Sequence, residues 1–205
     1  MNEILRIGID IDDVLADSLP AYLRAFNRRF GLEIPEAEAG WEIFRRYPEI
    51  PADELEAFFA ELYRADFLGS RPLVPGAREG VERLHRAGHC LFIITGRLRR
   101  DRDITARWMG QAGLSAFFEA IVDRDGTDAP LHKRRAVEEL RLDVLLEDEY
   151  AVALAAAEIA GRVLLFDRPW NQGSLPGHAV RIHSWSEVGP CLSGRTNRGK
   201  SAACG

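Results

Sequence analysis

Ile9-Asp10-Ile11-Asp12-Asp13-Val14 closes the first apolar run of the chain, which begins at Ile4. Side chains two apart on an extended chain point to the same side, so Asp10 and Asp12 can converge. In α/β folds, the carboxyl ends of the strands are where ligands bind. One carboxylate can attack an electrophile there while the other transfers a proton. The alternative is that acidic residues merely end a strand and begin a loop.

Short apolar runs recur along the chain, and helical patterns separate them. After Ile4–Ile9 the clearest runs are Leu91–Ile94, Val144–Leu146 and Val163–Phe166, with weaker ones at Ala120–Val122 and Ala179–Ile182. Such continuous runs indicate strands that are buried on both faces of a parallel sheet. Helical spacing covers Ala77–Ala87, Ile104–Ala112, Lys133–Leu140 and Glu149–Ala160. This alternation predicts an α/β three-layer sandwich with a mainly parallel, Rossmann-like sheet.

One stretch interrupts the alternation. Between residues 18 and 70 there is no convincing strand, only helical patterns. Ser18 is an expected N-cap with Pro20 in the first turn, and a second helix follows Pro51. We therefore expect a core of residues 1–17 and 71–189, a small helical cap of residues 18–70 over the end of the sheet, and a flexible tail of residues 190–205, which are small, polar and aperiodic.

Aromatic residues gather in a turn-rich part of this insertion. Trp41, Phe44 and Tyr47 lie between the two expected helices rather than on a long apolar stripe. Packing inside the cap is the simplest role for each of them. At least one, with Trp41 as the first candidate, is expected to face the pocket and stack on a planar substrate group.

Two further sequence features contain polar residues that are candidates for the site. Thr95-Gly96-Arg97 directly follows an apolar run, and a hydroxyl beside exposed backbone N–H groups can hold a phosphate, with Gly96 permitting close approach. The alternative is a glycine turn with a solvated arginine. Lys133 stands near the start of a helix, where Lys133-Arg134-Arg135 also fits a solvated basic face.

Glu147-Asp148 follows the buried run Val144–Leu146. Paired hard oxygen donors that face the aspartates of the first strand indicate Mg²⁺. Acidic residues that favour the positive end of a helix dipole are the alternative. Each signal alone is modest, but three of the four follow strands whose ends a parallel sheet brings to one edge.

The net charge of the chain limits the kinds of partner that it is expected to bind. The 205 residues carry 27 Lys and Arg against 32 Asp and Glu, a formal net charge of −5. A nucleic-acid polymer or an acidic membrane surface would require a basic face, so neither is expected as a partner. The first residues lack a secretion signal and no run reaches the ~20 apolar residues of a membrane span. A cytoplasmic setting is the default.

The ordered set of signals resembles the haloacid dehalogenase-like superfamily of phosphatases. Its pattern of DxDx[VT], a strand-end Ser or Thr, a Lys and an acidic pair is matched over about residues 4–185. Ile9–Ser18 and Leu165-Phe166-Asp167-Arg168-Pro169-Trp170-Asn171 look like the 5'(3')-deoxyribonucleotidase branch and its uncharacterised bacterial relatives. The acidic pair departs from the better-known nucleotidases, because it begins with Glu147 where they have Asp.

The resemblance implies a role for each matched residue. Asp10 would be the nucleophile that forms an aspartyl-phosphate, and Asp12 the general acid and then base. Thr95 would bind the phosphoryl group, while Lys133 would orient the nucleophile and offset charge. Gly96 and Arg97 are expected beside that phosphoryl group on the chemistry of the residues themselves. The implied Mg²⁺ ligands are Asp10, the Asp12 carbonyl and the acidic pair, with Glu147 preferred over Asp148.

The sequence thus predicts a Mg²⁺-dependent phosphomonoester hydrolase for a small phosphorylated substrate. A nucleoside monophosphate is the preferred candidate for that substrate. A phosphatase for another small metabolite is the nearest alternative, because one catalytic edge serves many substrates. A non-catalytic phosphate-binding or scaffold protein is the alternative from a different class. Assembly into a homodimer is left open.

Overall fold

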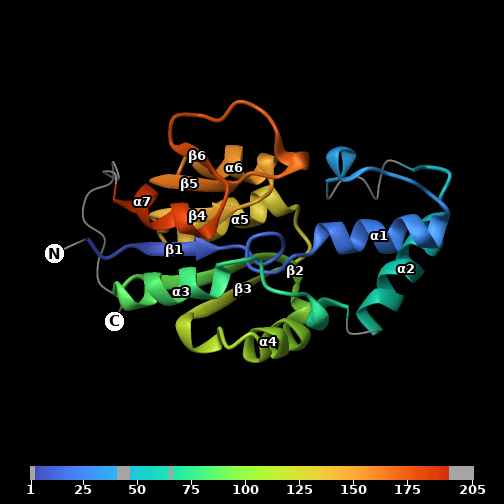
Figure 1. The fold of residues 1–205 in the computed structure, drawn as a ribbon, viewed down its shortest axis with the longest axis horizontal. Coiled ribbons are helices and arrows are strands. Elements are labelled where there is room, and N and C mark those ends of the chain that lie inside the picture. The colour runs from blue at the N-terminus through green and yellow to red at the C-terminus, as the bar shows by residue number, and fades with distance from the viewer. Residues whose placement is uncertain (1–2, 41–46, 65–66, 194–205) are drawn as a thin grey trace.

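A single parallel sheet organises the chain (Figure 1). The computed structural model describes residues 3–40, 47–64 and 67–193. The strands are β1 (Arg6–Ile9), β2 (Cys90–Leu98), β3 (Ala120–Arg124), β4 (Val144–Glu147), β5 (Arg162–Phe166) and β6 (Ala179–Ile182). Their order is β3-β2-β1-β4-β5-β6, and every neighbouring pair is parallel. The predicted α/β fold is confirmed, including the two strands whose sequence signals were weak.

Outside the insertion, a single α-helix separates successive strands as far as β5. The helices are α1 (Leu19–Phe30), α2 (Ala52–Arg64), α3 (Ala77–Arg86), α4 (Arg102–Gln111), α5 (Ala129–Glu139), α6 (Tyr150–Ala157) and α7 (Val188–Leu192). None of the helices in the described ranges is long and apolar enough to cross a bilayer.

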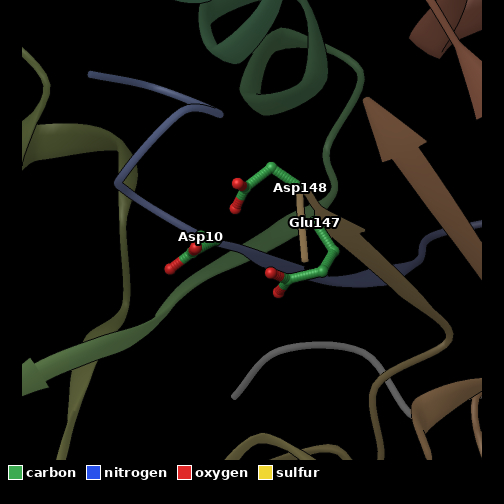
Figure 2. Close-up of side chains that lie close together, drawn as sticks. All are labelled: Asp10, Glu147 and Asp148. Carbon is green, nitrogen blue, oxygen red and sulfur yellow. The ribbon is translucent and has the colours of Figure 1, made fainter. Parts of the chain in front are cut away.

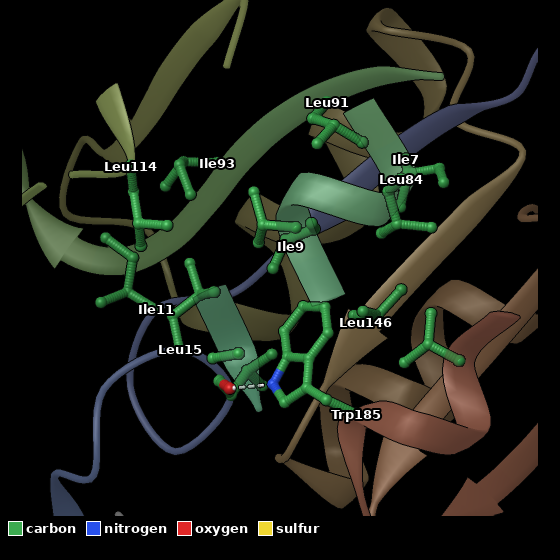
Figure 3. Close-up of a cluster of buried hydrophobic side chains, with 14 of the residues drawn as sticks. Ile7, Ile9, Ile11, Leu15, Leu84, Leu91, Ile93, Leu114, Leu146 and Trp185 are labelled. Carbon is green, nitrogen blue, oxygen red and sulfur yellow. Dashed lines mark hydrogen bonds between the residues drawn. The ribbon is translucent and has the colours of Figure 1, made fainter. Parts of the chain in front are cut away.

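Alternate side chains of each strand face two separate cores. In β2, Leu91 and Ile93 join the cluster under α3, α4 and α7, whereas Phe92 and Ile94 join the cluster under α5 and α6. Burial on both faces explains why the strands read as continuous apolar runs instead of alternating ones. Figure 3 shows the first cluster, where the Trp185 indole N–H donates to the Val14 carbonyl over 2.9 Å. The sheet is therefore the middle layer of three.

The insertion forms two helices beyond the carboxyl end of β1 (Figure 1). Leu19, Tyr22 and Phe26 of α1 pack with Phe58 of α2 in a cluster of their own, as the helical spacing predicts. Tyr47 is partly buried against this cluster, 6.1 Å from the Phe26 ring centroid, so it packs within the insertion. The other two aromatic candidates, Trp41 and Phe44, lie outside the described residues.

The C-terminal segment differs from the expectation at its start. The tail was expected from residue 190, but α7 covers Val188–Leu192, and Cys191 and Leu192 pack against the core under α3. Sequence spacing over five residues is too short to reveal a helix, since one turn has little periodicity to read. Residues 194–205 lie outside the described part of the chain.

Candidate active site

The strand order creates a switch point at β1. The chain passes from β1 to β2 and β3 on one side, and later places β4, β5 and β6 on the other. At such a point the loops after neighbouring strands diverge and leave room for a ligand at the carboxyl edge. Asp10 follows β1, Glu147 ends β4, and the Asp10 N–H donates to the Leu146 carbonyl over 3.1 Å. The sheet thus brings the two acidic motifs together.

Three buried carboxylates gather at this edge. Ligand atoms of Asp10, Glu147 and Asp148 all lie within 4.8 Å of one another, and the three side chains approach from the ends of β1 and β4 (Figure 2). Oδ1 of Asp10 has no hydrogen-bond partner among the described residues, although it is buried. A buried polar atom without a partner is costly, so this oxygen is available for a ligand.

Lys133 of α5 lies among the carboxylates. Its Nζ is 2.9 Å from Asp10 Oδ2 and donates to both Glu147 oxygens, over 2.9 and 3.1 Å. Burial alone would lower the pKa of Lys133, but the charges of Asp10 and Glu147 outweigh it and raise the pKa above its usual value. Lys133 is 2% exposed. The solvated basic face considered for this residue is therefore wrong for Lys133.

One lysine does not balance three carboxylates. Burial, together with Glu147 and Asp12, raises the pKa of Asp10 to about 7 against the attraction of Lys133. Burial and the charges of Asp13 and Glu147 raise the pKa of Asp148 well above its usual value. Two like charges ~4 Å apart repel by ~4 kcal/mol at an effective dielectric of ~20. Clustered hard oxygen donors with excess negative charge fit a divalent cation such as Mg²⁺.

Asp12 is held separately from this cluster. Arg97 donates Nε to Oδ2 over 2.8 Å and Nη2 to Oδ1 over 2.7 Å, and the Ser18 hydroxyl donates to Oδ1 over 2.5 Å. Burial works to raise the pKa of Asp12, but the charge and hydrogen bonds of Arg97 and the Ser18 hydroxyl together lower it. Asp12 is therefore ionised at neutral pH, with both oxygens engaged.

Ser18 occupies the N-cap position of α1, as predicted, but its side chain makes no capping bond. The carboxylate of Asp13 takes that role, accepting the N–H groups of Ser18 and Leu19 over 3.0–3.1 Å. Asp13 adopts φ = 61°, a left-handed conformation that aspartate tolerates better than most residues. The Ser18 hydroxyl is thereby free to bind Asp12.

Thr95, Gly96 and Arg97 lie within β2 rather than after it. The strand continues to Leu98, with a shift of register against β3 after Ile94. Oγ1 of the buried Thr95 accepts the Arg97 N–H over 3.1 Å. A Cβ added at Gly96 would meet nothing within 4 Å, so the backbone there borders open space. The solvated arginine considered for this motif is wrong, because Arg97 is 6% exposed.

A family model described as 5' nucleotidase, deoxy (pyrimidine), cytosolic type C protein matches residues 2–195. The chain belongs to this family. The type C nucleotidase model thus covers the sheet, the insertion and all the site residues named above.

Similar proteins carry consistent names. A protein named "Putative nucleotidase YqfW" from Bacillus subtilis is 27% identical over 192 residues, covering 90% of this chain and 92% of its own. A nucleotidase of Clostridium acetobutylicum is 25% identical over 186 residues, covering 91% and 92%.

Solved structures share the fold. A haloacid dehalogenase-like hydrolase of Streptococcus pneumoniae superposes with a TM-score of 0.71 at 19% identity, covering 93% of this chain and 99% of that one. CbbY of Rhodobacter sphaeroides, solved in complex with phosphate, superposes with a TM-score of 0.65 at 24% identity, covering 91% and 96%. Together with the nucleotidase family, these likenesses confirm a haloacid dehalogenase-type phosphatase, whose substrate class is a small phosphorylated molecule.

Sequence reasoning assigned no role to the loop after β5, although its residues 165–171 carried part of the family resemblance. Trp170 Nε1 donates to Asp148 Oδ2 over 3.0 Å, and Asn171 Nδ2 donates to the Asp148 carbonyl over 2.6 Å. Arg168 Nη2 donates to the Asp13 carbonyl over 2.6 Å. The position of this loop in the chain could have indicated its role. It follows a strand adjacent to β4 and so leaves the sheet at the same edge as Asp148.

Proposed function

We propose that this nucleotidase is a Mg²⁺-dependent phosphomonoester hydrolase that forms an aspartyl-phosphate on Asp10 and acts on (deoxy)nucleoside 5'-monophosphates. The observation that carries the proposal is the partly unpaired Asp10 carboxylate, held by Lys133 beside Glu147 and Asp148 at the switch point. A non-catalytic phosphate binder would gain nothing from this arrangement, since buried carboxylates repel a phosphate.

Two displacements at phosphorus account for hydrolysis. In the first, an Asp10 oxygen attacks phosphorus and the bond to the leaving oxygen breaks, while Asp12 gives that oxygen its proton. In the second, water attacks phosphorus, Asp12 takes a proton from the water, and the bond to Asp10 breaks. The products are the alcohol, inorganic phosphate and the regenerated carboxylate of Asp10.

Asp12 must be protonated before the first displacement, yet Arg97 holds it ionised in the resting structure. We infer that a phosphate dianion draws one arm of the Arg97 guanidinium from Asp12, since this fork suits phosphate as well as carboxylate. Arg97 then binds substrate, as expected from the sequence, and still orients Asp12 through its remaining N–H, while the released Asp12 oxygen accepts a proton. Gly96 borders open space in which the phosphoryl group would lie, and the neighbouring Thr95 is proposed to bind that group.

Mg²⁺ would be held by the Asp10 carboxylate, the Asp12 carbonyl and the acidic pair. When bound, it supplies positive charge that offsets the carboxylates and the phosphoryl oxygens. Both Glu147 oxygens already accept from Lys133, and Oε1 also accepts the Glu149 N–H over 3.1 Å. The Asp148 carboxylate accepts no hydrogen bond from Lys133. These contacts favour Asp148 as the direct ligand and Glu147 as the anchor of Lys133, which reverses the preference drawn from the family resemblance.

Substrate choice is assigned to the insertion, because the catalytic edge contacts only the phosphoryl group and metal. Trp41 is proposed to stack on the base, which is worth ~1–3 kcal/mol per base in other nucleic-acid sites. Trp41→Ala should then raise KM for a nucleotide more than for a compact substrate such as phosphoglycolate. Equal increases for both substrates would assign Trp41 to packing within the cap.

Phosphate release from a panel of deoxynucleotides, ribonucleotides and sugar phosphates tests the whole proposal. We expect hydrolysis with Mg²⁺, its loss with chelator, and higher kcat/KM for nucleotides than for sugar phosphates. If sugar phosphates are the better substrates, the alternative of another small-metabolite phosphatase replaces the nucleotidase. The cytosolic description of the family supports a cytoplasmic setting for the reaction.

A further inference from the structure

The loop after β5 joins the acidic pair to the insertion through one side chain. Trp170 lies in the short helical turn Pro169–Asn171, and its indole N–H donates to Asp148 Oδ2 over 3.0 Å. The same side chain packs against the hydrophobic cluster of α1 and α2. A Cβ added at Gly40 would stand 3.6 Å from Trp170 Cβ, so the insertion touches this residue directly.

The backbone around Trp170 is fixed to the site as well. Asn171, which is fully buried, donates Nδ2 to the carbonyls of Asp148 and Phe166 over 2.6 and 2.7 Å. Its Oδ1 accepts from the Arg168 N–H over 3.2 Å and from Arg181 Nη1 over 2.6 Å. The Asn171 amide therefore ties the turn that carries Trp170 to the backbone of Asp148.

Residues 36–40 form the part of the insertion that contacts this turn. The short turn Glu36–Glu38 lies beside Pro169–Asn171. The N–H groups of Glu38 and Ala39 donate to the carbonyls of Pro35 and Glu36 over 3.0 and 3.1 Å. Ala39 is buried in the same cluster that Trp170 packs against. Trp170 and residues 36–40 thus pack against each other.

We propose that Trp170 is a positioning residue that orients the Asp148 carboxylate toward the metal and couples metal binding to the packing of the insertion at residues 36–40. This inference rests on the proposed function, in which Asp148 is a metal ligand. A ligating carboxylate binds best when a second group fixes its orientation, and losing such a group typically costs 10–100-fold in metal affinity. By thermodynamic linkage, metal binding then favours the packed arrangement of residues 36–40.

Two substitutions separate the functions of the side chain. Trp170→Phe keeps a ring against the insertion and loses the N–H that binds Asp148, whereas Trp170→Ala loses both. Trp108→Phe is the matched control, because the buried Trp108 indole N–H donates over 2.8 Å to the backbone carbonyl of Arg71 instead of a carboxylate. Each variant is first checked for a native circular dichroism spectrum and cooperative melting.

Metal affinity is measured directly on the metal-free full chain, with Mn²⁺ as the probe and free Mn²⁺ followed by electron paramagnetic resonance. Mn²⁺ suits the same hard oxygen ligands as Mg²⁺. We expect Trp170→Phe to weaken Mn²⁺ binding about 10–100-fold and Trp108→Phe to leave it unchanged. Native affinity in Trp170→Phe would overturn the positioning role. Absence of Mn²⁺ binding to the native chain would instead overturn the metal site of the proposed function.

Hydrogen exchange of the Glu38 and Ala39 amides, followed by mass spectrometry, tests the coupling. Mg²⁺ should slow exchange in the native chain and in Trp108→Phe, and should lose this effect in Trp170→Phe. In Trp170→Ala these amides should exchange faster even without metal. If Mg²⁺ slows exchange equally in Trp170→Phe and the native chain, the coupling does not pass through the indole N–H.

Discussion

Arg97 holds both carboxylate oxygens of Asp12, with Nε 2.8 Å from Oδ2 and Nη2 2.7 Å from Oδ1. The proposed acid of the reaction is thus bound by a buried cation in the resting protein. A bidentate arginine fixes the direction of a carboxylate as well as its charge. The pair therefore sets the orientation of Asp12, and the first prediction follows from this dependence.

Arg97→Gln should lower kcat by about tenfold or more for an alkyl phosphate and less for p-nitrophenyl phosphate, whose leaving group needs little acid assistance. Asp12→Asn should show the same pattern with a larger loss. If Arg97 raises kcat by positioning Asp12, the double variant should have nearly the kcat of Asp12→Asn alone. Losses in kcat that simply add would show that Arg97 acts independently of Asp12.

Asp10→Asn should abolish turnover and preserve the fold, since the amide is nearly the same size and cannot form an aspartyl-phosphate. Loss of a nucleophile should remove several kcal/mol of transition-state stabilisation, so less than about a hundredth of the rate is expected to remain. The rate is measured by phosphate release, and circular dichroism serves as the control for folding. Residual activity above that level would remove Asp10 as nucleophile.

Replacing the two members of the acidic pair should have different effects. Asp148→Asn is expected to raise the Mg²⁺ concentration for half-maximal activity about tenfold or more, because it weakens a hard anionic ligand. Glu147→Gln should change that concentration less and lower kcat, since Lys133 would lose a charged partner. Titration of activity with Mg²⁺ distinguishes the two variants. The opposite ranking would restore Glu147 as the direct ligand.

The metal-free protein should lose stability as the pH rises from about 6.5 to about 8. The pKa of Asp10 is about 7 and that of Asp13 about 8, both raised mainly by burial from the usual 3.8. Over this range the native state binds more protons than the unfolded state, so the free energy of unfolding falls as pH rises.

Thermal melting in the presence of chelator checks this pH dependence. Asp13→Asn, which keeps the acceptor for the Ser18 and Leu19 N–H groups but does not titrate, should remove the part of the fall nearest pH 8. Mg²⁺ should raise Tm more at the upper end of the range, because protons compete with a metal for its ligands. A melting temperature that is constant with pH would contradict the raised pKa values.

The sheet could be predicted from the sequence because every strand is buried on one or both faces by apolar side chains. Ala120–Val122 and Ala179–Ile182 were the weakest signals. They lie in β3 and β6, the two edge strands of the sheet, which have a partner strand on one side only within the described residues. Site residues that directly follow strands, such as Asp10 and Glu147, could be predicted from the rule that parallel strands share one carboxyl edge.

Contacts between distant side chains could not be predicted in the same way. Ser18 is a residue type that commonly caps a helix, and its position before α1 predicts that role. The sequence does not show that Asp13 accepts the N–H groups at the helix start while the Ser18 hydroxyl binds Asp12. Trp170 was recognisable only as part of a family motif, because its bond to Asp148 joins residues 22 positions apart. Local patterns fix where a residue lies, but the partner of a polar group depends on the packed structure.

The anchoring of α1 to the loop after β1 constrains how the insertion can be exchanged between related proteins. Asp12 and Asp13 both bind groups at the start of α1, through the Ser18 hydroxyl and the N–H groups of Ser18 and Leu19. A chimaera joined at residue 17 would supply a foreign helix start to the proposed acid. Grafts of a new specificity insertion should therefore retain Ser18 and the first turn of α1, and place the junction further along the chain.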